Sequence, residues 1–107
     1  MGELSLPAGI PPVYRGGPSL TFKPHEVKRD RRTGLLRTTH GISVDATAEY
    51  IARFGGAYVV RRIPEGLMII QRGRRPTHYE IVPAFPMTPD HYQSLLDQVA
   101  LELFQEE

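Results

Sequence analysis

Seven polar side chains, placed at expected strand ends or beside glycines, carry the chemistry that this sequence offers. A guanidinium holds phosphates and carboxylates through paired hydrogen bonds, an imidazole exchanges protons near neutral pH, and a carboxylate stabilises developing positive charge. Such a set is suited to binding an anionic substrate and to acid–base or electrostatic work on it. The seven residues are Tyr14, Arg15, His40, Ser43, His78, Tyr79 and Glu80.

Two of these positions lie next to glycines. Arg15 precedes Gly16 and Gly17, so a ligand can approach the backbone beside its guanidinium. The alternative for Arg15 is an ion pair at the surface end of a strand. The hydroxyl of Ser43 can bond a ligand or, as is commoner, a nearby backbone group. His40 can belong to the same site or be an exposed side chain.

The segment from Thr77 to Glu80 is the densest polar cluster. Glu80 can stabilise positive charge or orient a sugar hydroxyl, and His78 can donate to an anion or act as acid or base. Alternation along a strand places His78 and Glu80 on one face and Tyr79 on the other. Tyr79 is then either part of the core or a stacking surface. The alternative for the cluster is an edge strand whose polar side chains face water.

The composition excludes several classes of protein. The sequence has no Walker loop and no GxGxxG, HExxH or GxSxG motif. Without cysteine it has no thiolate nucleophile, disulfide or cysteine-ligated zinc, and we expect no metal site. No segment approaches the roughly 20 apolar residues of a membrane span, and the first residues lack the basic end and apolar run of a signal peptide. We therefore expect no membrane partner.

The net charge of +1 conceals an uneven distribution. Residues 1–76 carry all 13 Lys and Arg but 6 of the acids, a net charge of +7, whereas residues 77–107 carry 6 acids and no Lys or Arg. This split predicts either a face that binds a phosphate-bearing partner or a solvated surface whose charges segregate only in sequence. The basic turn of Arg72, Arg74 and Arg75 precedes His78 and can help to hold a phosphate or nucleic acid.

The length of 107 residues predicts a single domain. We place it at residues 13–107 and expect an α+β domain with a small, mainly antiparallel sheet, a short middle helix and a longer C-terminal helix. Residues 1–12 are expected to form an extended arm, because Pro7, Pro11 and Pro12 oppose a helix.

The expected strands are short apolar runs that end at Gly or Pro turn signals. They lie at 13–15, 41–44, 57–63, 67–71 and 78–82. Turns at 64–66 and 72–76 join the last three strands and predict an antiparallel meander. Residues 23–37 form a polar, basic loop with room for one helical turn.

Two helices have recognisable start signals. The first is expected over 46–54, with Asp45 as its N-cap and Gly55-Gly56 at its end. The second begins after the N-cap Thr88, with Pro89 at the first helical position. Its apolar stripe at helical spacing consists of Tyr92, Leu95, Leu96, Val99, Leu103 and Phe104.

Three segments, taken in order, resemble one protein family. Val13-Tyr14-Arg15 resembles its opening strand and Gly41-Ile42-Ser43-Val44-Asp45 its Gly-x-Ser-Val segment. The most specific match, residues 77–87, resembles its Thr-His-Tyr strand, which runs into a Pro-Ala-x-Pro-Met turn and a final helix. The family is a group of type VI secretion effector toxins with an ADP-ribosyltransferase-like fold, and the resemblance covers about residues 13–105. Similar sequences also look like C-terminal modules of polymorphic toxins.

The resemblance implies an activity. The order Arg15, Ser43, Glu80 is similar to the Arg–Ser–Glu arrangement of one ADP-ribosyltransferase branch, in which the Arg helps to hold NAD, the Ser supports the site and the Glu steers the nicotinamide ribose. The chain is shorter than most transferase domains, and the toxin family does not require an acid after its His-Tyr pair. The implied function is transfer of ADP-ribose from NAD to a target macromolecule, or hydrolysis of NAD.

On this interpretation each candidate residue has a role. The catalytic set is Arg15, Ser43, His78 and Glu80, and the residues that bind NAD are Tyr14, Arg15, His40, Ser43 and Tyr79. Cleavage of the nicotinamide–ribose bond passes through an oxocarbenium-like state, and nicotinamide leaves as a neutral molecule. Electrostatic stabilisation and positioning are therefore the main contributions expected of the protein.

Two other functions remain open. In a metal-independent ribonuclease toxin, His78 and His40 serve as acid and base, with Arg15 or Arg37 on the scissile phosphate. A non-enzymatic binding module instead docks an acidic protein on its basic face. As a toxin, the chain implies a secreted or injected effector that acts in the cytoplasm of a target cell. It also implies a cognate neutralising protein, which the charge of residues 1–76 predicts to be acidic.

Overall fold

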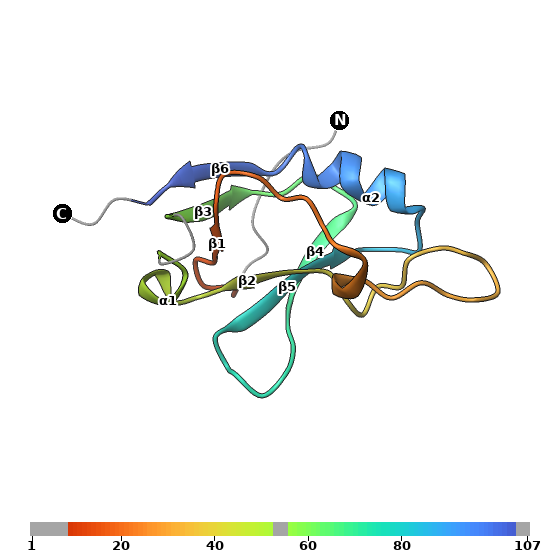
Figure 1. Ribbon diagram of the computed structural model, residues 1–107, viewed down its shortest axis with the longest axis horizontal. Coiled ribbons are helices and arrows are strands. Elements are labelled where there is room, and N and C mark those ends of the chain that lie inside the picture. The colour runs from red at the N-terminus through yellow and green to blue at the C-terminus, as the bar shows by residue number, and fades with distance from the viewer. Residues whose placement is uncertain (1–8, 53–55, 105–107) are drawn as a thin grey trace.

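A single six-stranded sheet organises the computed structural model, which describes residues 9–52 and 56–104 (Figure 1). In spatial order the strands are β4-β5-β2-β1-β3-β6, and every neighbouring pair is antiparallel. This arrangement confirms the expected α+β class and mainly antiparallel sheet. The strands are β1 Tyr14–Gly16, β2 Ile42–Asp45, β3 Ala57–Arg62, β4 Leu67–Gln71, β5 His78–Pro83 and β6 Ala100–Leu103.

Three short helical segments connect these strands. They are the 3₁₀ turn η1 Pro24–Glu26, the helix α1 Ala48–Ala52 and the helix α2 Pro89–Leu96. The η1 turn corresponds to the single helical turn that the sequence allowed within the loop predicted at 23–37. At the start of α2, the hydroxyl of Thr88 accepts a hydrogen bond from the backbone N–H of His91 at 3.1 Å, as the N-cap prediction requires. Among the described residues, no helix is long and apolar enough to cross a membrane.

The pairing of β2 with β5 is set by a close approach of their backbones. A Cβ atom on Gly41 would lie 1.9 Å from the carbonyl oxygen of Ile81, so no larger residue fits at this position. Beside it, the hydroxyl of Tyr92 accepts from the backbone N–H of Ile42 at 3.0 Å and donates to the same Ile81 carbonyl. The Tyr92 side chain of α2 is thereby hydrogen-bonded to both β2 and β5.

The core lies between the sheet and α2. Tyr92, Leu95 and Leu96 of α2 are buried, in agreement with the part of the predicted stripe that they form. They belong to a cluster with Ile42 and Ile81 of the central strands. Burial raises the pKa of Tyr92 well above its ordinary value, so the hydroxyl stays protonated and able to donate.

The predicted meander is wrong in one respect. The hairpin of β4 and β5 forms as expected, with Ile69 opposite Ile81, but β3 does not pair with β4. Instead β3 lies between β1 and β6 on the other side of the sheet. The turn at 64–66 is present, and Gly66 adopts a positive φ of 104°, yet the chain uses it to cross from one half of the sheet to the other. Both edges of β3 pair with strands that are distant in sequence. Turn signals between neighbouring segments do not predict such pairings.

The predicted C-terminal helix is too long. α2 ends at Leu96, and residues 100–103 form β6 on the edge of β3, with Leu101 opposite Val60 and Leu103 opposite Tyr58. The segment after Asp97 carries apolar residues at both helical and alternating spacing, so periodicity alone does not decide its structure. Pairing with the open edge of β3 favours the strand.

The first helix begins later than predicted, and residues 53 and 54 of its predicted range lie outside the described residues. α1 starts at Ala48, so Asp45 is the last residue of β2 rather than its N-cap. The carboxylate of Asp45 nevertheless accepts from a backbone N–H of the following turn, that of Thr47, at 2.8 Å. Gly55 of the predicted helix stop and residues 1–8 of the predicted arm lie outside the described residues.

The double role of the Tyr92 hydroxyl generates a stability prediction. Tyr92→Phe keeps the ring but leaves the buried Ile42 N–H and Ile81 carbonyl without that partner, and each unsatisfied group costs about 1–3 kcal/mol. We expect the free energy of unfolding, measured by urea titration, to fall by about 2–4 kcal/mol. The matched control is Tyr58→Phe, because the Tyr58 hydroxyl bonds no described residue. An equal loss in both variants would contradict the assignment.

Candidate functional site

One cavity of about 400 Å³ brings together residues that are distant in sequence. It lies where β1, β2 and β5 are neighbours in the sheet and α1 follows β2. Its lining includes Arg15, Ser43 and His78, three of the four predicted catalytic residues. Tertiary structure therefore places the position-15 guanidinium and the position-78 imidazole at one site. The full lining is Arg15, Gly16, Ser43, Val44, Asp45, Ile51 and His78.

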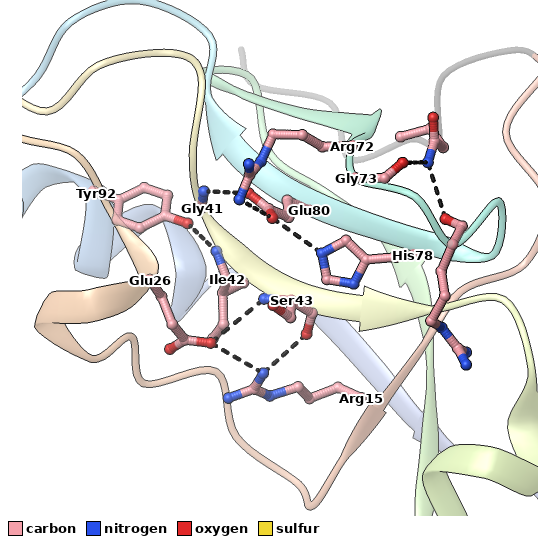
Figure 2. A network of polar contacts seen from close by, with 12 residues as sticks. Arg15, Glu26, Gly41, Ile42, Ser43, Arg72, Gly73, His78, Glu80 and Tyr92 are labelled. Carbon is pink, nitrogen blue, oxygen red and sulfur yellow. Dashed lines mark hydrogen bonds and ion pairs between the residues drawn. The ribbon is translucent and has the colours of Figure 1, made fainter.

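The guanidinium of Arg15 is held by two contacts (Figure 2). Its Nη1 donates to the backbone carbonyl of Ser43 at 2.9 Å and lies 3.5 Å from a carboxylate oxygen of Glu26. Glu26 comes from η1, and its other oxygen accepts from the backbone N–H of Lys23 at 2.9 Å. The remaining donors of Arg15 bond no described residue, so the fork is positioned and still able to bind an anion.

Ser43 fixes this arrangement through its backbone. Its carbonyl accepts from Arg15, and its N–H lies 3.5 Å from the Glu26 carboxylate, a long hydrogen bond. Ser43 is one of the residues that line the cavity, and its hydroxyl bonds no described side chain or backbone group. It is therefore available to a ligand as donor or acceptor.

Glu80 is buried behind the cavity and bonded by three donors (Figure 2). One carboxylate oxygen accepts from the backbone N–H of Gly41 at 3.0 Å, and the other accepts from Nη2 of Arg72 at 2.7 Å. Nε2 of His78 lies 3.0 Å from the second oxygen. The Glu80 side chain is 3% exposed and is absent from the cavity lining. Its carboxylate therefore contacts His78 rather than the space that a substrate would occupy.

The ionisation of Glu80 sets the tautomer of His78. Burial pushes the pKa of Glu80 upward, but hydrogen bonds from Arg72, His78 and Gly41 outweigh it and hold the pKa below its ordinary value. An ionised carboxylate only accepts hydrogen bonds, so Nε2 of His78 must carry the proton that it donates. Nδ1 of His78 bonds no described residue and is the nitrogen left for a ligand.

A second buried carboxylate, that of Asp45, lines the cavity directly. It accepts from Nη2 of Arg75 at 2.6 Å and lies 3.5 Å from the hydroxyl of Thr77. Burial raises the pKa of Asp45, but the bonds from Thr47, Arg75 and Thr77 outweigh it and lower the pKa overall. Asp45 lies opposite His78 in the β2–β5 pairing. The cavity wall thus carries a negative charge that the basic turn between β4 and β5 compensates.

Three predicted NAD-binding residues lie outside the cavity lining. The ring of Tyr14 packs edge-to-face on Phe104, with centroids 5.2 Å apart, and Tyr79 packs against the core. Nδ1 of His40 lies 2.8 Å from the hydroxyl of its neighbour Thr39. The alternation predicted for β5 is confirmed, because Tyr79 faces the core whereas His78 and Glu80 meet on the other face.

Sequence reasoning missed Glu26 and Asp45 as site residues. It interpreted Arg72 and Arg75 as part of a solvated turn or of a phosphate-binding turn, and not as partners of buried acids. Glu26 carried one signal, as a single acid within the basic segment 23–37. Asp45 was interpreted as the N-cap of the following helix, and this local role gave no reason to place its carboxylate in a site. The partners of Arg72 and Arg75 are side chains on other strands, and no spacing along the chain indicates them.

No family model, curated protein or solved structure matches this chain. The resemblance to the effector toxin family therefore rests on the three sequence segments given above, and the activity that it implies is a proposal.

The lowered pKa of Glu80 predicts how stability depends on pH. Because the folded pKa lies below the ordinary value of 4.5, ionised Glu80 stabilises the fold fully above that pH. This contribution is lost as pH falls through the folded pKa. We expect Glu80→Gln to lower the unfolding free energy by about 2 kcal/mol at pH 7, and the difference from wild type to shrink below about pH 4.5.

The matched control is Glu102→Gln. Glu102 also pairs with an arginine, at 2.6 Å from Arg61, but its side chain is 61% exposed, so we expect a loss below about 1 kcal/mol. Chemical denaturation from pH 3 to pH 8 measures both variants. A Glu80→Gln difference that grows on acidification would contradict the assigned ionisation.

Proposed function

We propose that this chain is an ADP-ribosyltransferase-like toxin domain that cleaves NAD at the nicotinamide–ribose bond. ADP-ribose then passes to a target macromolecule or to water. The supporting observation is that Arg15, Ser43 and His78, contributed by three strands, line one cavity. They come from the three segments whose order resembles the toxin family.

The cavity has the chemistry to accept half of a dinucleotide. Its volume of about 400 Å³ lies in the lower part of the range for small-molecule sites. Val44 and Ile51 supply apolar surface for a flat ring, and the polar groups of Ser43 and His78 can bond ribose hydroxyls or a carboxamide. We therefore place the nicotinamide and its ribose inside the cavity and the adenosine half over its mouth.

Arg15 is the proposed phosphate ligand. The Ser43 carbonyl and Glu26 hold Nη1, so the unbonded nitrogens of the fork are oriented without further loss of side-chain freedom. Glu26 offsets part of the Arg15 charge, and binding an anion adds the charge-assisted bonds that the fork still lacks. Preorganisation of this kind lowers the free-energy cost of positioning the substrate.

Glu80 enters the proposal as a positioning residue. Its carboxylate is bonded by three donors and 3% exposed, so it holds the ring of His78 and fixes its Nε2 proton. The carboxylate on the cavity wall is that of Asp45. We assign to Asp45 the electrostatic stabilisation of positive charge on the ribose, because charge fixed in a poorly solvated site acts more strongly than in water.

The ribonuclease alternative requires two imidazoles at one phosphate. Of the pair His40 and His78, only His78 belongs to the cavity lining. The Nε2 proton of His78 is bonded to Glu80, which leaves a single nitrogen facing the site. The geometry therefore favours NAD cleavage over this alternative.

A toxin domain of this kind also needs a neutralising protein in the cell that makes it and delivery into the cell that it attacks. We propose that the neutralising protein is acidic, because residues 1–76 carry a net charge of +7. Its placement over the cavity mouth would exclude NAD directly.

Substitution of the cavity residues tests the function. Arg15→Ala removes the phosphate ligand and His78→Ala a ribose ligand, so each is expected to lower the rate of nicotinamide release from NAD about 100-fold or more. The matched controls Arg62→Ala and His91→Ala remove an exposed arginine and an exposed histidine from β3 and α2, and we expect wild-type rates. Nicotinamide release is followed chromatographically, and thermal unfolding confirms that each variant is folded.

Total RNA incubated with the same proteins separates the alternatives. RNA fragments without nicotinamide release would replace NAD cleavage with the ribonuclease function. Absence of both activities from folded wild-type protein, together with harmless expression in cells, would favour a binding module.

A further inference from the structure

A basic hairpin, residues 28–37, projects from the body of the molecule beyond η1 (Figure 1). It contains five cationic side chains and one carboxylate. None of its residues lines the cavity, so the proposed NAD site does not account for it. The five cations are Lys28, Arg29, Arg31, Arg32 and Arg37.

The basic hairpin is held by its own hydrogen bonds. The Arg37 N–H donates to the Lys28 carbonyl at 2.7 Å, and Asp30 exchanges backbone bonds with Leu35 and Gly34 at 2.8 Å each. The Asp30 carboxylate also accepts from the backbone N–H of Arg32 at 2.8 Å. At its base, buried Leu36 pairs with Met87. The cations are therefore presented on an ordered arm rather than on a loose loop.

Most of the charge on the basic hairpin is uncompensated. Asp30 lies 3.9 Å from Arg37, an exposed and weak pair. The side chains of Lys28, Arg29, Arg31 and Arg32 are exposed, and none pairs with any other residue that the structure describes. Among the other described cations, Arg15, Arg61, Arg72 and Arg75 pair with acids, whereas Lys23, Arg62 and Arg74 are single exposed cations, so the hairpin is distinguished by four unpaired cations within five residues. An ordered arm of unpaired cations is suited to a polyanionic partner.

The basic hairpin adjoins the network behind the cavity. Burial and the charge of Arg72 lower the pKa of His40, and Lys28 and Arg37 at the base of the hairpin lower it further. His40 precedes Gly41, whose N–H bonds Glu80. From His40 the chain runs directly into β2, which carries Ser43 into the cavity. The base of the basic hairpin is thus joined through His40 to the strand that lines the cavity, while its tip projects at the opposite end of the molecule from α1 (Figure 1).

The side chains of the basic hairpin distinguish a nucleic acid from an acidic protein. Its apolar residues are Leu35, which is half-buried, and Leu36, which is buried, so it exposes no apolar or aromatic anchor. Anchors of protein interfaces, which include Arg, are packed and desolvated at the centre of the interface, and several adjacent exposed cations without apolar neighbours are poorly suited to that, whereas affinity for nucleic acid arises from phosphate contacts. The absence of aromatic side chains also indicates contact with the phosphate backbone rather than base stacking.

We infer that the basic hairpin is a docking arm for a nucleic acid and that this nucleic acid is the acceptor of ADP-ribose. The inference rests on the proposed function and names its substrate class. In the transfer, a nitrogen or oxygen of the nucleic acid forms a bond to the ribose carbon that carried nicotinamide. The nicotinamide–ribose bond breaks, its electron pair leaves with neutral nicotinamide, and the proton of the attacking group is released to water. No oxidant or further reactant is needed.

Two adjacent arginine pairs provide a matched test. The variant Arg31→Gln/Arg32→Gln removes two cations from the basic hairpin, and Arg61→Gln/Arg62→Gln removes two from β3. Fluorescence anisotropy measures binding of short labelled DNA and RNA, duplex and single-stranded, from low to moderate salt. We expect the hairpin variant to bind about tenfold more weakly or worse, with the slope of log affinity against log salt reduced by about 2. The β3 variant is expected to bind as wild type.

Activity measurements separate this inference from the proposed function. Both double variants are expected to release nicotinamide at the wild-type rate without acceptor, and the hairpin variant to lose transfer of labelled ADP-ribose from NAD to nucleic acid. Nicotinamide release without nucleic-acid binding would overturn the inference and leave the proposed function standing. Nucleic-acid binding without nicotinamide release would overturn both the function and the acceptor role.

Further outcomes would also overturn the inference. Equal weakening in the hairpin and β3 variants would show an effect of net charge alone. Competition by polyglutamate as strong as that by nucleic acid would assign the basic hairpin to an acidic protein. Both outcomes are read from the same anisotropy measurements at matched salt concentration.

Discussion

The close contact of β2 with β5 is the constraint on which the rest of the molecule depends. Gly41 lies against the Ile81 carbonyl, where any Cβ would collide, and its N–H bonds the Glu80 carboxylate. The next N–H, that of Ile42, bonds Tyr92. Side chains from β5 and α2 thus accept the hydrogen bonds of the backbone N–H groups at the start of β2. These contacts favour the β2–β5 register in which Ser43 lies opposite Glu80 and Asp45 opposite His78. A slip of one residue would turn the polar face of the site toward the core.

Two buried carboxylates are tolerated because the turn between β4 and β5 supplies cations. Arg72 and Arg75 reach back from this exposed turn to Glu80 and Asp45. Together with the other donors to each carboxylate, their hydrogen bonds outweigh the desolvation that would otherwise raise both pKa values. Each arginine is about half exposed, which keeps most of the guanidinium hydrated. This turn, for which the sequence left a solvated surface and phosphate binding both open, therefore supplies the two arginines that compensate the buried carboxylates of the site.

Two groups of cations on the surface differ in their pairing. Arg15, Arg72 and Arg75 pair with buried or partly buried acids around the cavity, whereas the cations at the tip of the basic hairpin are unpaired among the described residues. Paired cations order a small site, and unpaired cations attract a large anion from a distance, with an effect that salt screens. The division gives a physical reason for assigning a dinucleotide to the cavity and a polymer to the hairpin in the proposals above.

The sequence by itself determined the features that depend on neighbouring residues. These include the α+β class, the alternation of β5, the β4–β5 hairpin and the Thr88 cap of α2. Tertiary structure decided that β6 replaces the end of the predicted helix and that β3 lies far from β4, because open strand edges are filled by segments distant in the chain. It also decided that Glu80 is buried and that Asp45 lines the cavity. Burial and ion pairing depend on which strands become neighbours, and no local spacing records that choice.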